Sequence, residues 1–249
     1  MERIKGMAFL KEVRFDWSKV KNRERYPFNI PAFNDIQSLC MDRNVVFLVG
    51  ENGTGKSTLL EAIANACDFS TISGGRNHLL VDSRGDFSLS DIIALSWFPK
   101  VEKGFFLRSE SFFNFANYLD DLAEEFGGNV YAPYGGKSLH QQSHGESFLS
   151  LFNNHFQRKG IYLLDEPEGA LSPQRQLAFL RIIWELESAG KAQFIIATHS
   201  PILLSYPNSM IYCFDEEGLK QKTYQETEHY QLTKDFLNNT ELFLNKLLR

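Results

Sequence analysis

Cysteine is scarce in this chain of 249 residues, which has three: Cys40, Cys67 and Cys213. They stand far apart with no C-x-x-C pair, which argues against a zinc site or a disulfide framework and favours a reducing, cytoplasmic setting. Runs of about 20 apolar residues are also missing, and the start, MERIKGMAFLKEV, lacks the apolar core of a signal peptide. We therefore expect a soluble protein with no direct membrane insertion.

Positive charge is not in excess. Lys and Arg number 26 against 31 Asp and Glu, a formal net charge of −5, so the chain as a whole is not a basic nucleic-acid binder, although a local patch stays open. Hydrophobic residues make up 43% and charged residues 23%, as in an average soluble protein, which excludes disordered, collagen-like and coiled-coil chains. The length suits one domain, or one domain with an inserted lobe.

Short buried strands alternate with helices along the chain. The predicted strands are Met7–Phe15, Asn44–Val49, Gly104–Arg108, Ile161–Leu164, Gln193–Ala197 and Met210–Phe214, and the predicted helices are Ser57–Cys67, Ser90–Trp97, Ser111–Phe126, Glu146–Phe156, Gln174–Ser188 and Thr233–Leu248. This order predicts an α/β fold with a mostly parallel sheet. Leu219–Thr223 is expected to add an antiparallel portion by pairing with Met210–Phe214 across Gly218. Residues 109–158 interrupt the alternation and are interpreted as an inserted helical lobe in a single domain, 1–249.

A glycine-rich segment follows the strand Asn44–Val49. It reads GENGTGKS and matches G-x-x-x-x-G-K-[ST] between a strand and a helix, the context that this phosphate-binding motif requires. Glycines let the backbone wrap around phosphate oxygens, and the helix presents its positive end to the anion. We expect Lys56 to reach the β- and γ-phosphates and the Ser57 hydroxyl to ligate Mg²⁺. The residues expected to hold the nucleotide are Gly50, Glu51, Asn52, Gly53, Thr54, Gly55, Lys56, Ser57 and Thr58.

Two carboxylates end the apolar strand that reads IYLLDE. Beside a phosphate cradle this pattern predicts that Asp165 holds Mg²⁺, directly or through water. Glu166, the next residue, is then a candidate general base that polarises the attacking water. Alone, a strand ending in Asp-Glu would be read as a solvated strand end.

The order of four motifs, GENGTGKST, QSHGES, LLDEPEGALSP and ATHS, is similar to that of ABC-type ATPases. The first block with LLEAIA resembles the soluble SMC and RecF-like branch more than transporter subunits. The chain also resembles, over nearly its whole length, a family of small bacterial AAA/ABC-like ATPases that consist of a single domain. The resemblance implies a P-loop NTPase fold whose helical lobe carries the signature motif, with ATP and Mg²⁺ as cofactors.

Residues 143–146, SHGE, occupy the place of the family signature, usually Ser-Gly-Gly-Gln. In ABC dimers this loop opens a helix and caps the γ-phosphate bound to the opposite subunit. The resemblance therefore implies that the Ser143 hydroxyl and the Gly145 N–H are donors, with Glu146 beside them. A plain helix N-cap at Ser143, with Glu146 as its capping-box partner, is the alternative and is compatible with that role.

Further features are read from the same resemblance. His199 in ATHS matches the switch histidine that contacts the γ-phosphate and the attacking water, which makes Lys56, Glu166 and His199 the expected catalytic set. The loop ALSP matches the segment that lines the dimer seam, with Ser172 where many members have Asp. Finally, ABC domains usually carry a glutamine between the cradle and the signature. This chain has none from Met41 to His140, and Arg108 or Glu110 is the candidate substitute.

Several weaker candidates for functional residues also have a purely structural interpretation. Tyr26 or Phe28 is expected to stack on the adenine, against a role as core aromatics. His140 and His144 are spaced for a metal, although structural roles are favoured. A basic run next to Tyr26 is interpreted as a solvated loop; its residues are Lys19, Lys21, Arg23 and Arg25. A phenylalanine-rich stretch is interpreted as core; its residues are Phe105, Phe106, Phe112, Phe113 and Phe115.

Together these features predict a Mg²⁺-dependent ATPase that forms a homodimer around ATP and switches a partner, in DNA repair or defence. The alternative is a nucleotide-gated regulatory subunit of a nuclease, toxin or transporter with little turnover of its own. DNA or a protein effector is the expected partner in either case. The altered signature and the absent glutamine argue against a transporter energy subunit.

Overall fold

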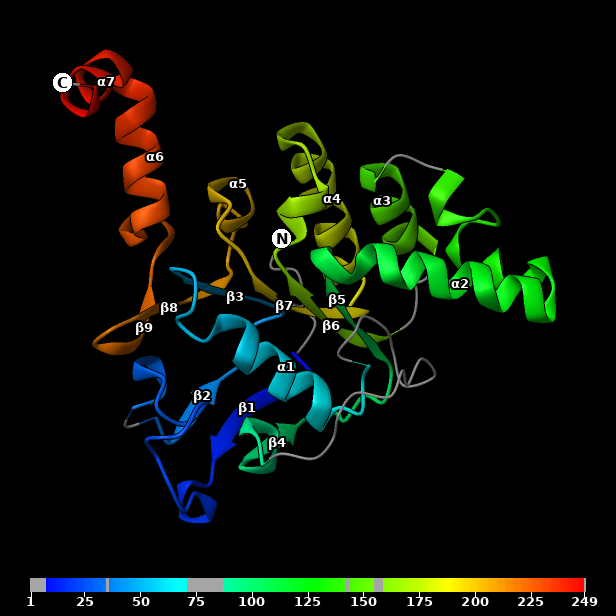
Figure 1. The fold of residues 1–249 in the computed structure, drawn as a ribbon, viewed down its shortest axis with the longest axis horizontal. Coiled ribbons are helices and arrows are strands. Elements are labelled where there is room, and N and C mark those ends of the chain that lie inside the picture. The colour runs from blue at the N-terminus through cyan, green and yellow to red at the C-terminus, as the bar shows by residue number, and fades with distance from the viewer. Residues whose placement is uncertain (1–7, 35, 71–86, 142–143, 155–158, 249) are drawn as a thin grey trace.

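The computed structural model describes residues 8–34, 36–70, 87–141, 144–154 and 159–248. A six-stranded sheet, ordered β5-β6-β7-β3-β8-β9, lies at its centre (Figure 1). Its strands are β3 (Val45–Gly50), β5 (Gly104–Arg108), β6 (Gly160–Asp165), β7 (Ala192–Ala197), β8 (Met210–Asp215) and β9 (Gly218–Lys222). All neighbours are parallel except β8 and β9, which pair antiparallel. The predicted α/β class, the parallel sheet and the antiparallel β8–β9 pair are confirmed.

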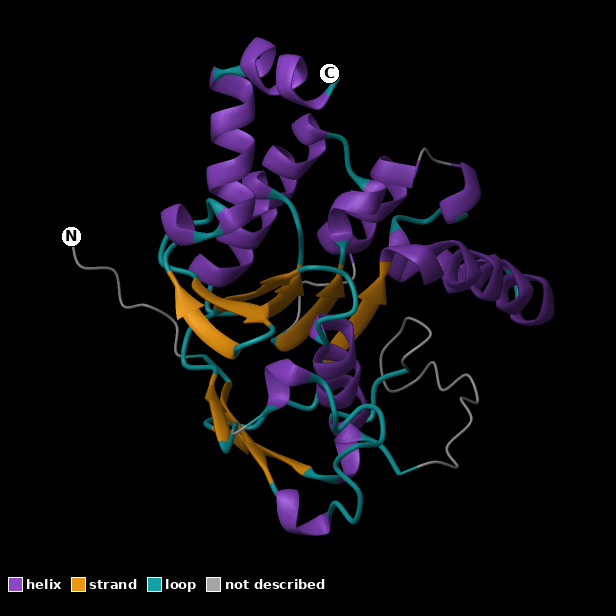
Figure 2. Ribbon diagram, turned by 60° about the vertical axis from the view of Figure 1, so that its left-hand side comes forward, coloured by secondary structure: helices purple, strands orange, loops and turns teal. Residues whose placement is uncertain are grey.

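The central strands are apolar on both faces because the sheet is covered on both sides. Along β3, Val46 and Leu48 belong to one hydrophobic cluster while Phe47 and Val49 belong to the other, as expected when successive side chains point to opposite faces. Helix α1 (Lys56–Ala66) and a second sheet cover the first face. Helices α2 to α5 cover the other, so the fold has three layers (Figure 2).

The second sheet is antiparallel, with β1 (Leu10–Phe15) between β2 (Ser38–Cys40) and β4 (Ile93–Trp97). The prediction of a helix over Ser90–Trp97 is wrong. A capping box of Ser88 and Asp91 closes only a short 3₁₀ turn, Leu89–Asp91, after which the chain extends and pairs with β1. A short apolar run has no decisive periodicity, so its pairing with β1 decides its conformation.

A fully buried glutamine links the two sheets. Gln193 on β7 is fully buried, and its Oε1 accepts hydrogen bonds from the Phe9 and Leu10 amides at 3.0 and 2.7 Å. Its Nε2 donates to the carbonyl oxygens of Leu10, Met41 and Arg43 at 2.9, 2.8 and 3.1 Å. Because these groups lie outside the strand pairings of β7, Gln193 anchors the small sheet to the large one.

The described residues between β5 and β6 form helices and turns, among them α2 (Phe112–Phe126) and α3 (His144–Asn154), as predicted for the helical lobe. Most of the phenylalanines predicted as core are buried: Phe105, Phe106, Phe112 and Phe115 are at most 3% exposed, whereas Phe113 is 53% exposed. Edge contacts, such as Phe105 on Phe115 with centroids 5.3 Å apart, dock α2 on the sheet.

The C-terminal part contains α4 (Pro173–Ser188), the short α5 (Pro201–Leu204), α6 (Glu228–Asn238) and α7 (Thr240–Leu247). The predicted helical tail over Thr233–Leu248 is confirmed, but it begins earlier, at Glu228, and breaks at Asn239, whose φ of −136° is not helical. In both ribbon views α6 and α7 project away from the sheets (Figures 1 and 2). Within the described ranges no helix is long and apolar enough to cross a bilayer.

Candidate functional site

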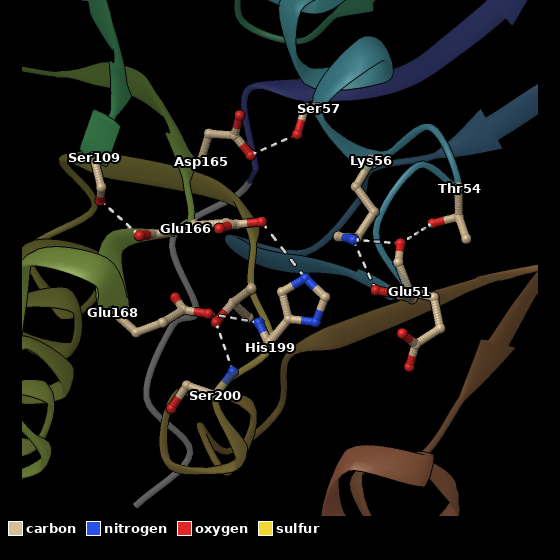
Figure 3. A network of polar contacts seen from close by, with 12 residues as sticks. Glu51, Thr54, Lys56, Ser57, Ser109, Asp165, Glu166, Glu168, His199 and Ser200 are labelled. Carbon is tan, nitrogen blue, oxygen red and sulfur yellow. Dashed lines mark hydrogen bonds and ion pairs between the residues drawn. The ribbon is translucent and has the colours of Figure 1, made fainter. Parts of the chain in front are cut away.

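The candidate site lies at the carboxyl ends of neighbouring parallel strands. Strands β3, β6 and β7 end at Gly50, Asp165 and Ala197, and the predicted motif residues follow directly. In a parallel α/β sheet these ends share one edge, where ligands generally bind. The structure thus brings the glycine-rich loop, the two carboxylates and the ATHS segment together (Figure 3).

The glycine-rich loop connects β3 to α1 through left-handed backbone. Gly53 and Gly55 have φ of 81° and 102°, values that suit glycine. At Gly50 the reason for glycine is contact, since a Cβ there would lie 2.4 Å from the carbonyl oxygen of Phe214. The helix following the loop directs its first amides toward the bend, which is the geometry of an anion-binding cradle.

Lys56 lies inside this loop. It is 4% exposed, and its ammonium donates to the carbonyl oxygens of Gly50 at 2.7 Å and Glu51 at 2.9 Å. Burial lowers the pKa of Lys56 below its usual value, while the carboxylates of Glu166 and Asp165 oppose this shift. A buried ammonium held at the mouth of a cradle of amides is suited to neutralise a polyphosphate.

Asp165 connects the loop to the neighbouring strands. It is 3% exposed; its Oδ1 accepts from the Ser57 hydroxyl at 3.0 Å and its Oδ2 from Arg108 Nε at 2.9 Å. Arg108 also pairs with Glu61 on α1. Arg108, one of the two candidate substitutes for the absent glutamine, thus touches the proposed metal carboxylate directly. Glu110, the other, is exposed.

Ser57 and Asp165 offer hard oxygen donors at the wall of a cavity of about 280 Å³. Mg²⁺ is usually bound by one or two protein oxygens together with phosphate oxygens and water, not by an all-protein cage. The two oxygens therefore fit Mg²⁺ when a nucleotide supplies the rest. In the described part of the chain, no group of three or more His, Cys, Asp or Glu side chains forms a metal cage.

Glu166 has an unusual, left-handed backbone conformation. Its φ and ψ are 51° and 53°, a left-handed conformation that costs a non-glycine residue on the order of 1 kcal/mol. Three hydrogen bonds hold it: its amide donates to Ala197 O at 2.9 Å, and its carbonyl oxygen accepts from Ser109 Oγ at 2.6 Å and Gly169 N at 3.0 Å. This backbone aims the half-exposed carboxylate toward His199 (Figure 3).

His199 is held on several sides. Its amide donates to Glu168 Oε1 at 2.6 Å, and its Nε2 lies 3.5 Å from Glu166 Oε1. Its Nδ1 lies 3.0 Å from Nε2 of His229, which belongs to α6. Burial raises the pKa of Glu168, and the His199 amide partly offsets this shift. The predicted switch histidine is therefore beside the predicted general base.

The signature segment lies apart from this network. Ser143 falls outside the described residues, while Gly145 and Glu146 lie in the first turn of α3. Gly145 is packed so closely on α4 that a Cβ would lie 2.3 Å from the guanidinium of Arg175, which pairs with Glu146 at 3.5 Å. Ser172 caps α4 by accepting from the Arg175 amide at 3.4 Å. Among the described residues, Gly145 and Glu146 of the signature and Ser172 of the seam segment thus all contact Arg175 of α4.

The two aromatic candidates have different surroundings. Tyr26 is 66% exposed, and its hydroxyl lies 3.1 Å from the Thr58 hydroxyl beside the cradle. Phe28 is 4% exposed and packs in the core, with its ring 5.5 Å from that of Phe87. The candidacy of Phe28 for base stacking is therefore corrected, because its ring is covered, and Tyr26 keeps the stacking role as a prediction.

The weaker candidates of the sequence analysis are a basic run and a pair of histidines. The basic run Lys19–Arg25 is exposed apart from the half-buried Val20, and Arg23 stacks over Trp17 at 4.4 Å. His140 is exposed with its ring against Phe113, centroids 4.8 Å apart. The side chain of His144 lies outside the described part, so the proposed His140–His144 metal pair is not assessed.

Sequence reasoning missed the groups that hold the motif residues in place. Ser109, Glu168 and His229 contact Glu166 or His199, as described above. Glu168 is part of the DEPE run, so its neighbourhood was a usable signal. Ser109 lies between the two candidates Arg108 and Glu110, so its neighbourhood was also a signal, whereas His229 comes from a segment with no motif of its own.

Solved structures share this fold. The chain is similar to an SMC head bound to the C-terminal winged-helix domain of ScpA, with 12% identity and a TM-score of 0.51 over 86% of this chain and 98% of the other. It is also similar to "a putative metal-chelate type ABC transporter" in an inward-facing conformation, with 12% identity and a TM-score of 0.50 over 91% and 88% of the two chains. The fold is thus that of the ABC and SMC-head class of P-loop proteins.

Two family models match the parts of the chain that carry the motifs. One, described as "AAA domain", matches residues 28–117, which include the cradle. The other, described as "AAA domain, putative AbiEii toxin, Type IV TA system", matches residues 140–205, which include Asp165, Glu166 and His199. No curated protein matches the sequence. The chain thus has the fold of ABC ATPases and SMC heads and matches AAA-domain models over both motif-bearing parts, which supports an ABC/SMC-like P-loop ATPase.

Proposed function

We propose that this chain acts as a single ATPase domain that binds ATP with Mg²⁺, closes as a homodimer around it and hydrolyses it to switch a partner in the cytoplasm. The observation that carries the proposal is the contact of 3.0 Å between Ser57 Oγ and Asp165 Oδ1. This contact joins the glycine-rich loop to the acidic strand end. P-loop proteins use these two elements together, one for the phosphates and one for Mg²⁺, in phosphoryl transfer.

The roles of the residues follow from their positions. Residues Gly50 to Thr58 surround the phosphates, and the Lys56 ammonium leaves the carbonyl oxygens of Gly50 and Glu51 to meet the β- and γ-phosphates. Ser57 and Asp165 hold Mg²⁺, which neutralises phosphate charge. Glu166 orients and deprotonates the attacking water, and His199 Nε2 donates to the γ-phosphate.

Dimer formation is proposed from the placement of the signature. Gly145 and Glu146 pack against Arg175 on α4 of their own chain. A donor pair that caps the γ-phosphate must then come from a second copy, and reciprocal capping gives a two-fold dimer. Ser143 and Gly145 are the proposed donors, with Glu146 beside them. ATP would favour the closed dimer and hydrolysis would release it.

Nucleotide binding is tested first, by calorimetry with ATP and Mg²⁺. The wild-type chain is expected to bind, and Lys56→Ala is expected to weaken binding by roughly a hundredfold because the buried charge is lost. Lys220→Ala is the matched control, since Lys220 pairs with Glu217 at the surface. Absence of heat from the wild-type chain would overturn the proposal.

Hydrolysis and dimerisation are tested with Glu166→Gln. This variant is expected to bind ATP, to release no phosphate and to run as a dimer by light scattering only when ATP is present. Glu217→Gln, an exposed control, is expected to behave as the wild type. A Glu166→Gln chain that stays monomeric with ATP bound would contradict the dimer.

A regulatory subunit with little turnover is the second candidate, because one observation favours a protein partner. Helices α6 and α7 carry exposed leucines, with Leu237 at 69%, Leu247 at 72% and Leu248 at 80% exposure, more than a monomer normally leaves on one short segment. One family description names a toxin of a type IV toxin–antitoxin system, which suits a role in defence. Phosphate release measured with and without DNA separates a DNA effector from a protein effector.

A further inference from the structure

The contact between His199 and His229 reaches from the candidate site to the C-terminal helices. Their nearest ring nitrogens, Nδ1 of His199 and Nε2 of His229, are 3.0 Å apart, and the ring centroids are 5.2 Å apart. On its other side His199 presents Nε2, which is buried and makes no hydrogen bond to any described residue. Glu166 Oε1 lies 3.5 Å from it. The three side chains therefore form a line, Glu166, His199, His229.

Only one proton fits between the two imidazoles. A nitrogen pair at 3.0 Å is a hydrogen bond in which one ring donates and the other accepts, and the choice determines which nitrogen of His199 carries its own proton. If His229 donates, His199 Nδ1 is the acceptor and His199 bears its proton on Nε2. If His199 donates from Nδ1, its Nε2 is a bare lone pair that faces the Glu166 carboxylate and repels it.

The surroundings favour donation by His229. The buried Nε2 of His199 faces a carboxylate, which stabilises a proton on that atom. His229 is half-buried, and burial is the main cause that lowers its pKa. Of the groups that act on it by charge, His199 and Lys56 also lower this pKa, while Glu51 and Glu228 raise it. An uncharged His229 at neutral pH still has one N–H to donate.

We propose that His229 is a positioning residue whose Nε2–H donates to His199 Nδ1 and thereby holds His199 in the tautomer that carries a proton on Nε2. The inference rests on the proposed function in one respect: the proton on Nε2 is the one that His199 would offer to the γ-phosphate. His229 lies at the start of α6, a helix with no buried residue. Displacement of α6 would therefore remove this hydrogen bond, so the C-terminal helices can report on, or regulate, the site.

The test uses the full chain and three variants. His229→Gln keeps an N–H near the position of Nε2, His229→Phe keeps a ring without a donor, and His140→Phe is the matched control, since His140 is exposed on the helical lobe. Two-dimensional ¹⁵N spectra of the histidine rings, recorded without nucleotide, report the His199 tautomer. Phosphate release gives kcat and KM for ATP.

The expected result is a wild-type His199 with its proton on Nε2, retained in His229→Gln and mixed between both nitrogens in His229→Phe. The kcat of His229→Phe is expected to fall by about tenfold, as when a group that orients a histidine is lost, with KM within about twofold of the wild type. His229→Gln should recover most of kcat. The proposal is overturned if His199 keeps the same tautomer in His229→Phe, or if the Gln and Phe variants lose kcat equally.

Failure of the proposed function would look different. A wild-type chain that binds no nucleotide would contradict the proposed ATPase function. The tautomer of His199 is measured without nucleotide, so that measurement tests the role of His229 independently. A wild-type His199 protonated on Nδ1 would overturn the positioning role even in a fully active enzyme.

Discussion

At the scale of single residues, Arg108 is a member of the site whose charge differs from that of the residue usual in related domains. It stands near the place where related domains usually carry a neutral glutamine, yet it brings a positive charge to the carboxylate proposed to hold a cation. Arg108 and Asp165 are 24% and 4% exposed at their side chains, so the pair is largely removed from water. Loss of one partner then leaves the other charge poorly solvated.

We therefore expect Arg108→Met to lower the free energy of unfolding by about 3 kcal/mol, the cost of leaving a buried carboxylate without its partner. Urea denaturation followed by tryptophan fluorescence measures this loss. The double variant Arg108→Met with Asp165→Asn is expected to regain part of it, since the buried carboxylate charge at position 165 is then removed.

The control is Arg14→Gln, which breaks a surface pair with Glu12 where Arg14 is 65% exposed. Exposed pairs contribute little, so this loss should stay below about 1 kcal/mol. Equal losses from the two single variants would show that Arg108 is no more than a surface arginine.

At the scale of elements, one glutamine makes many of the polar contacts that hold the small sheet in position. Gln193 makes five hydrogen bonds to backbone groups of Phe9, Leu10, Met41 and Arg43, all from residues that precede the glycine-rich loop. The small sheet in turn packs with α1 in one hydrophobic cluster. The orientation of α1, and with it of the cradle, therefore rests partly on this side chain.

Gln193→Leu is expected to lower the free energy of unfolding by about 4 kcal/mol, because it leaves several buried amides and carbonyl oxygens unpaired. Thermal unfolding by circular dichroism measures the change. The matched control is Gln221→Leu on the exposed part of β9, which should leave the melting temperature nearly unchanged. A Gln193→Leu chain as stable as the control would mean that packing alone joins the sheets.

At the scale of the whole molecule, the two projecting parts define its surfaces. The helical lobe carries the signature segment against α4, and α6 and α7 extend from the sheet end near His199, which His229 of α6 contacts (Figure 1). In the proposed dimer the lobe of one copy faces the cradle of the other. A site built from two chains has a direct consequence for mixtures of variants.

A mixture of Lys56→Ala and Ser143→Arg chains is expected to recover ATPase activity although each variant alone is inactive. A mixed dimer contains one site with an intact cradle from one chain and an intact signature from the other, so random pairing restores about a quarter of the wild-type activity. Phosphate release from the separate and mixed variants measures this. No recovery, with mixed dimers shown by co-purification of differently tagged chains, would contradict capping in trans.

The chemical motifs were readable from sequence because each depends on a few residues at short, fixed spacing. Lys56 and Ser57 follow the glycines of one loop, and Asp165 and Glu166 end one strand. Their meeting could also be expected, since parallel strands place their ends on a common edge. The segment Ile93–Trp97 could not be read in this way, because its short apolar run becomes a strand only through pairing with β1.

The amino-acid sequence by itself determined the α/β class, the cradle and the acidic strand end, since local spacing dictates all three. Only the tertiary structure decided that Arg108 pairs with Asp165, that Gln193 joins the sheets and that His229 meets His199. Those contacts join residues 30 or more positions apart. Their partners are selected by the packing of whole elements, and no local pattern of side chains records that packing.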